Sequence, residues 1–126
     1  MLIDNPTFDS FVREAIDNIP EQYARVHENV VFEVADEPSL EQRKNAKLRP
    51  HDALFGLFEG VPDAGRSTRM SGLLPAKITI FRHPMIELYA DESLLKKQVS
   101  QTVWHEVAHY FGLNHEAMHR IQNNSK

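Results

Sequence analysis

The sequence predicts an α+β fold in a single domain that spans residues 1–126. Two segments carry apolar residues at helical spacing, and three short runs have the composition of strands. These helices and strands do not alternate strictly along the chain, which favours α+β over α/β. A length of 126 residues is close to the modal size of one domain. Hydrophobic residues at 41% and charged residues at 25% are ordinary for a globular protein.

The N-terminal segment predicts an amphipathic helix. Thr7 is expected to be its N-cap. Pro20 is expected to end it and to open a short second helix at its first position, carrying Tyr23 and Val26. The buried stripe of the first helix would consist of Phe8, Phe11, Val12, Ala15, Ile16 and Ile19.

Three runs predict strands. Residues 30–34, VVFEV, have the β-branched content of a strand, and so does KITIF at residues 77–81. The run LFGLF at residues 54–58 is nearly all apolar, which is expected of a strand covered on both faces. His83 precedes Pro84 and is therefore biased away from helix, so this pair is expected to close the third strand.

The connections between these strands are polar. Residues 35–52 are expected to form a connection with a short helix after Ser39, where Gln42 would complete a capping box. Residues 60–65 contain Pro62 and Asp63 and predict a turn.

A long helix is expected to follow Asp91, its N-cap, and to end at Gly112, which adopts a left-handed conformation without steric strain. Apolar residues repeat every four positions and would form its buried stripe: Leu95, Val99, Val103, Val107 and Phe111.

The end of this helix carries the residues with the clearest chemistry, the run HEVAHYFGLNH at residues 105–115. His105 and His109 are four residues apart, so on a helix both imidazoles lie on one face, roughly opposite the apolar stripe. Gly112 would turn the chain and let His115 return as a third zinc ligand. Glu106 could then reach a zinc-activated water as the general base without binding the metal. The site is expected to hold one zinc ion per chain.

The eleven residues resemble the extended zinc signature of the metzincins, but the chain is far too short for a typical member. It is more similar to the minimal zincin family of small bacterial metallopeptidase-like proteins. The likeness includes LFGLFEGVP, ITIFRHP and HEVAHYFGL, at residues 54–62, 78–84 and 105–113. It implies a compact zincin-like domain, in which a small mixed sheet packs on the active-site helix with N- and C-terminal helices. It also implies one zinc and Glu106 as general base. Family members often carry Asp where His115 stands, and either residue can ligate zinc.

Other residues have a functional and a plain interpretation. His119 is a rival ligand or a solvated histidine, and the latter is favoured because a catalytic zinc needs three protein ligands. Met118 either floors the site or packs in the core. Arg82 could hold an oxyanion, although a surface salt bridge is the simpler interpretation. Two further groups are expected to be structural: Trp104 and Tyr110 as core or cleft-wall residues, and His27, His51 and His83 as surface residues.

Three functions remain open. A metallopeptidase would act on peptides or unfolded protein segments that add to a sheet edge. A zinc-binding regulatory or interaction module would have little turnover, and a small-molecule amidohydrolase would share the metal chemistry. The sequence has no cluster of Lys and Arg interleaved with aromatic residues, which argues against nucleic-acid binding. It also has no apolar run long enough for a membrane helix. A cytoplasmic monomer is the default expectation, since no signal peptide is recognisable. The absence of cysteine excludes disulfides and leaves imidazole and carboxylate groups as zinc ligands.

Overall fold

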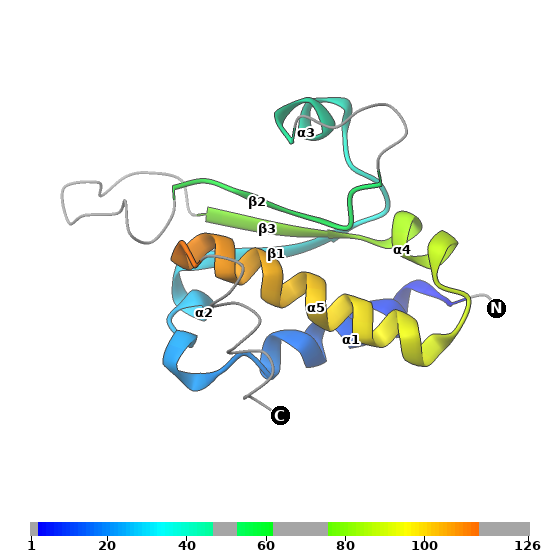
Figure 1. The fold of residues 1–126 in the computed structure, drawn as a ribbon, viewed down its shortest axis with the longest axis horizontal. Coiled ribbons are helices and arrows are strands. Elements are labelled where there is room, and N and C mark those ends of the chain that lie inside the picture. The colour runs from blue at the N-terminus through cyan, green and yellow to red at the C-terminus, as the bar shows by residue number, and fades with distance from the viewer. Residues whose placement is uncertain (1–2, 47–52, 62–75, 114–126) are drawn as a thin grey trace.

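The computed structural model describes residues 3–46, 53–61 and 76–113, and these form the predicted α+β arrangement of helices with a small mixed sheet (Figure 1). In chain order the elements are α1 (Asn5–Asp17), the 3₁₀ turn η1 (Glu21–Tyr23), α2 (Val26–Asn29), β1 (Val30–Ala35), α3 (Leu40–Asn45), β2 (Gly56–Glu59), β3 (Ala76–Phe81), α4 (Arg82–Leu88) and α5 (Glu92–Phe111).

The three strands are ordered β1-β3-β2. β1 runs parallel to β3, with Val30 opposite Ala76, and β2 runs antiparallel to it, with Gly56 opposite Ile80. Among the described strands, β3 is the one buried on both faces, since all of its residues except Lys77 are buried. The prediction that residues 54–58 form such a strand is wrong: the strand begins at Gly56, and only that residue of β2 is buried.

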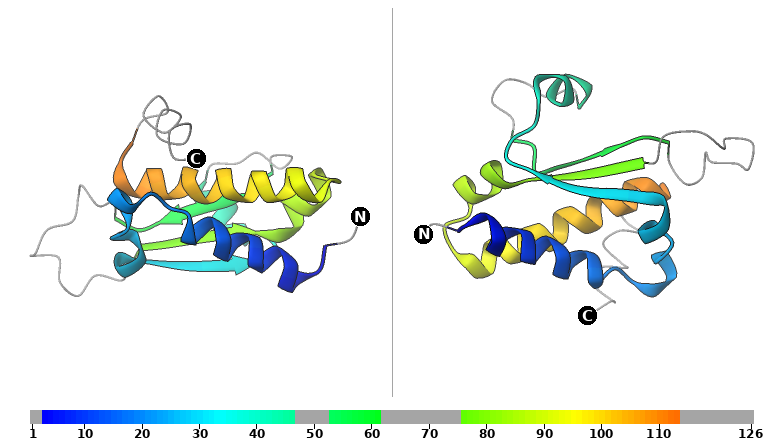
Figure 2. Two further views of the ribbon diagram at one scale, coloured as in Figure 1. Left: turned by 90° about the horizontal axis from the view of Figure 1, so that it is seen from below. Right: turned by 180° about the vertical axis from the view of Figure 1, so that it is seen from behind.

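Helices cover the sheet unequally. α1 and α5 lie side by side against one face, and the short α3 lies on the opposite side (Figures 1 and 2). Side chains from both helices and from the facing side of the sheet form the core. Its fully buried members include Phe8, Val26, Ile78, Ile80, Met85, Leu95, Val99, Val107 and Tyr110. The site-bearing helix α5 is thus anchored to α1 and to the sheet.

The N-terminal helix begins earlier than predicted. Asp4 is its N-cap and accepts a hydrogen bond from the backbone N–H of Thr7, so the prediction of Thr7 as N-cap is wrong. Pro6 fits inside the first turn because the N–H groups there have no helical acceptor. At the other end α1 stops at Asp17, three residues before Pro20. Pro20 is the N-cap residue of η1 and not the first residue of a helix. The segment carrying Tyr23 and Val26 is divided between η1 and α2.

Helix α4 corrects another expectation. The third strand does end at Phe81, as predicted. The expectation that the residue before Pro84 avoids helix is wrong, because His83 and Pro84 are the second and third residues of α4. Proline at the third helical position removes no intrahelical hydrogen bond. The backbone N–H of His83 donates instead to the carbonyl of Asp36, at 3.0 Å, which ties α4 to the end of β1.

Helix α5 has the predicted ends. Asp91 accepts from the backbone N–H of Leu94, and Gly112 caps the C-terminus with φ +71°. The stripe Leu95, Val99, Val103 and Val107 is buried, whereas Phe111 is only partly buried. Burial also includes Trp104, Glu106, Ala108 and Tyr110, so neighbours enclose this helix on more sides than an amphipathic stripe predicts.

The predicted capping box at the start of α3 is present, with Ser39 and Gln42 satisfying each other's backbone N–H groups. Gln42 also donates to the carboxylate of Glu59, which connects α3 to the end of β2. A C-terminal helix, if present, falls outside the described residues. Among the helices that are described, none combines the length and apolar character needed to cross a membrane.

Candidate metal centre

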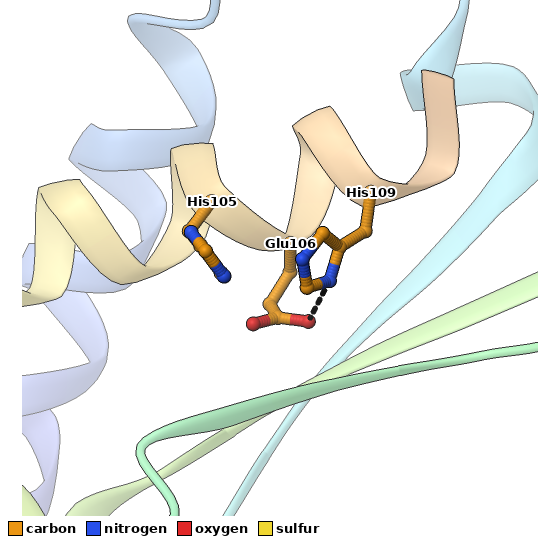
Figure 3. Close-up of side chains that lie close together, drawn as sticks. All are labelled: His105, Glu106 and His109. Atoms are coloured by element: carbon orange, nitrogen blue, oxygen red, sulfur yellow. Dashed lines mark ion pairs between the residues drawn. The ribbon is translucent and has the colours of Figure 1, made fainter. Parts of the chain in front are cut away.

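Three residues of the last turns of α5 gather their side chains at one point. His105, Glu106 and His109 each offer a metal-ligating atom, and these atoms lie within 4.8 Å of one another. All three project from the same side of the helix toward β2 (Figure 3). Their closeness follows from the helix itself, because His109 is four positions after His105 and three after Glu106, and residues at these spacings are neighbours on a helix surface.

Glu106 is buried, with 6% of its surface exposed, which is unusual for a carboxylate. Its Oε1 forms an ion pair with Nδ1 of His109 at 3.4 Å. The hydrogen bond and the charge of Glu106 raise the pKa of His109 above its ordinary value, against the opposing effect of burial. Since a metal binds only the neutral imidazole, a proton on His109 competes with a metal ion at this site.

The two imidazoles lie close together but differ in exposure. Their ring centroids are 4.3 Å apart, and His109 is 44% exposed while His105 is partly buried. Two imidazoles at this separation, with a carboxylate beside them, fit a zinc ion in the chemistry of their donors. Without cysteine in the chain, nitrogen and oxygen ligands are the available set.

Four further residues named in the sequence analysis fall on undescribed parts of the chain. His115, His119 and Met118 lie outside the described residues, as does His51. Gly112, in a left-handed conformation, ends α5 where the motif requires a change of direction before His115. The described part of the chain therefore brings together two of the three predicted zinc ligands and the predicted general base.

A close contact with β2, which the sequence analysis did not identify, lies directly beside the carboxylate. A Cβ atom at Gly56 would come within 2.8 Å of Cγ2 of Thr102 and 3.3 Å of Cγ of Glu106. Thr102 is one turn before Glu106 on α5, and its hydroxyl accepts a hydrogen bond from Gln98. Gln98 in turn accepts from the hydroxyl of Tyr89 at 2.8 Å. The available signal was the single glycine inside an apolar strand, which often marks a close backbone approach.

The other candidates are structural in this arrangement. Trp104 and Tyr110 are buried, and each packs against another aromatic ring, Tyr23 and Phe58 respectively. His27 and His83 lie at the surface as expected.

Arg82 forms salt bridges with Asp9 and Asp36, both at 2.9 Å, and its side chain is only 14% exposed. The hydrogen bond with Asp9 raises the pKa of Arg82 above its ordinary value. The salt-bridge interpretation of Arg82 is therefore correct, and Arg82 itself is largely buried, whereas its partner Asp36 is about half exposed.

Comparison with known proteins identifies a matching protein family. A family model described as a zincin-like metallopeptidase matches residues 27–124, which include all of the motif and each strand of the described residues. No curated protein matches the chain.

Proposed function

The chain belongs to the zincin-like metallopeptidase family, and from that premise we propose that it hydrolyses peptide bonds at one zinc ion held by His105, His109 and His115. The observation that carries the proposal is the convergence of His105, Glu106 and His109, with ligating atoms within 4.8 Å of one another. A zinc site that served structure alone would usually close its fourth position with a protein ligand and would have no use for Glu106.

Zinc, when bound, supplies a Lewis acid that lowers the pKa of a water molecule and polarises the scissile carbonyl. Glu106 is the group in this chain that accepts the proton of that water. Its position supports the assignment, because its carboxylate oxygen lies within 4.8 Å of the ligating atoms of His105 and His109 and so within reach of a water bound at the same site. His109 lies beside it, with Nδ1 3.4 Å from Oε1 of Glu106, so the carboxylate lies on the side of the helix where the ligands lie.

The substrate we propose is a peptide or an unfolded protein segment in extended conformation. β2 is the end strand of the described sheet, and its backbone at Gly56 approaches the Glu106 side chain. An extended peptide that adds to the outer edge of β2 would form main-chain hydrogen bonds there, and its carbonyl groups would pass close to Glu106.

The test is a peptide-library digestion with zinc-loaded protein, compared with its Glu106→Gln form. The amide cannot accept the proton of the water, so turnover should fall by about 10²- to 10⁴-fold. Zinc content, measured by metal analysis, and the far-UV circular dichroism spectrum should not change. Glu92→Gln is the matched control, because Glu92 is an exposed glutamate in the first turn of the same helix.

Two results would replace the proposal. Hydrolysis that is measurable and equal in wild type and Glu106→Gln would remove Glu106 from the mechanism. Stoichiometric zinc without cleavage of any peptide would favour the zinc-binding interaction module, unless small amides are hydrolysed, which would indicate an amidohydrolase.

A further inference from the structure

Gly56 is the position at which β2 packs against Thr102 and Glu106 of α5. Its backbone does not need glycine for conformational reasons, since among the described glycines only Gly60 and Gly112 have positive φ. Space is the reason: a Cβ atom here would meet Thr102 Cγ2 at 2.8 Å, and Glu106 Cγ and Ile80 Cδ1 both at 3.3 Å. Real Cβ atoms essentially never approach another heavy atom to 2.8 Å, so any side chain at position 56 must displace something.

The methyl group of Thr102 cannot easily move out of the way. Threonine in a helix has few χ1 rotamers, because its branched Cβ crowds the preceding turn. The rotamer present is held by the hydrogen bond from Gln98 Nε2 to Thr102 Oγ1 at 2.9 Å, and Gln98 is held by Tyr89. Turning the methyl group away would therefore break the polar chain from Tyr89 to Thr102. The lower-energy response to a side chain at position 56 is a shift of β2 away from α5.

We propose that Gly56 is a positioning residue for the reaction: by letting β2 seat directly on Thr102 and Glu106, it fixes the general base relative to the strand edge that receives the substrate. This inference rests on the proposed function, because it assigns a catalytic consequence to a packing contact. A substrate paired with β2 would move together with the strand, so its affinity would change little. The distance from its scissile carbonyl to Glu106 would change, and misplacement by about 1 Å can lower a rate by ~10²-fold.

The experiment is a rescue series around Gly56→Ala in the zinc-loaded full chain. Gly56→Ala should lower kcat by about 10- to 100-fold while KM stays within about threefold of wild type. Thr102→Ser removes the methyl group that the new Cβ would meet and retains the hydroxyl that Gln98 binds. The double variant Gly56→Ala,Thr102→Ser should therefore recover at least tenfold in kcat over Gly56→Ala alone.

Thr102→Val is the matched control, since it keeps a methyl group at the contact and removes the hydroxyl. Gly56→Ala,Thr102→Val should not recover activity. The proposal is overturned if valine rescues as well as serine, if serine does not rescue, or if Gly56→Ala is as active as wild type. Should Gly56→Ala fail to fold, the serine double variant still discriminates, because relief of the contact predicts that it folds and is active.

A readout without catalysis separates this inference from the proposed function. In ¹³C NMR spectra of glutamate-labelled protein, the Glu106 carboxyl resonance, assigned through Glu106→Gln, should shift in Gly56→Ala. It should return toward its wild-type position with Thr102→Ser and not with Thr102→Val. If wild type hydrolyses no peptide, the proposed function fails, and these spectra alone decide the packing contact. An unchanged Glu106 resonance in Gly56→Ala would overturn the inference even in an active enzyme.

Discussion

Glu106 is a carboxylate with only 6% of its surface exposed, next to residues that fill the core. Burying an ionised carboxylate is unfavourable unless a partner compensates for lost hydration. The compensation present is His109 at 3.4 Å, whose own pKa rises in consequence. An apolar side chain would pack here at lower cost, so the buried carboxylate supports the proposed chemical role of Glu106.

At this scale, the sequence predicts what is local and misses what is distant. His105, Glu106 and His109 come together because they are neighbours on one helix, and helical periodicity gives their relative directions. The contact of Gly56 with Thr102 joins positions far apart in the sequence, and periodicity says nothing of it. Asp4 replaces Thr7 as the N-cap because Pro6 can begin a helix, which moves its start by one turn.

The first prediction concerns the third zinc ligand. His115→Ala should weaken zinc binding by more than about 100-fold, because loss of an outer-shell partner already lowers metal affinity by ~10–100-fold. His119→Ala should change the affinity by less than about threefold, since it lies a further ~6 Å along any helix that resumes after His115. His115→Asp should retain zinc, because carboxylate oxygens ligate at ~2.0–2.2 Å. Competition against a graded series of chelators measures all three. Equal losses in His115→Ala and His119→Ala would show that His115 is the wrong choice.

At the scale of elements, α5 illustrates how much a stripe can predict. Leu95, Val99, Val103 and Val107 are buried as their spacing indicates, and both caps match. The additional burial of Trp104 and Tyr110 depends on the aromatic residues Tyr23 and Phe58, which arrive from η1 and β2. Likewise, the order of the strands depends on which strands pair with one another. The apolar run around Gly56 therefore does not predict that β2 is an end strand of the described sheet.

The second prediction concerns Arg82, which joins α1, the end of β1 and α4 through Asp9 and Asp36. Arg82→Met should lower the free energy of unfolding by about 1–3 kcal/mol, because charge-assisted hydrogen bonds from a largely buried guanidinium are lost. Urea unfolding measures this loss. Lys96→Met is the control, since its ion pair with Glu14 also joins two helices but is about half exposed. That variant should lose less than about 1 kcal/mol.

Activity distinguishes the structural role of Arg82 from an oxyanion role. If Arg82 only joins elements, kcat in Arg82→Met should stay within about threefold of wild type at temperatures where the variant is fully folded. A fall in kcat without a loss of stability would restore the oxyanion hypothesis.

At the scale of the whole molecule, the helix with the site is supported along one side by α1 and approached along another by β2 (Figures 1 and 2). The mixed sheet places β2 antiparallel to β3, so that its Gly56 end lies beside Thr102 and Glu106. The class of fold and the helix that bears the site could be predicted from local patterns. The meeting of this helix with the end strand could not, because it is set by the packing of the entire core.

The last prediction concerns metal removal. Zinc should bind the native site more tightly than it binds the unfolded chain, and it therefore stabilises the fold by linkage. At free zinc about 100-fold above its Kd the gain is ~2.7 kcal/mol, which for a domain of this size raises Tm by on the order of 10 °C. Scanning calorimetry before and after chelation should show this shift with one zinc lost per chain. His105→Ala,His109→Ala should show neither, whereas Glu106→Gln should show both, because its ligands are intact. An unchanged Tm after confirmed zinc loss, or stoichiometric zinc in the double variant, would refute the assignment of these histidines as the zinc site.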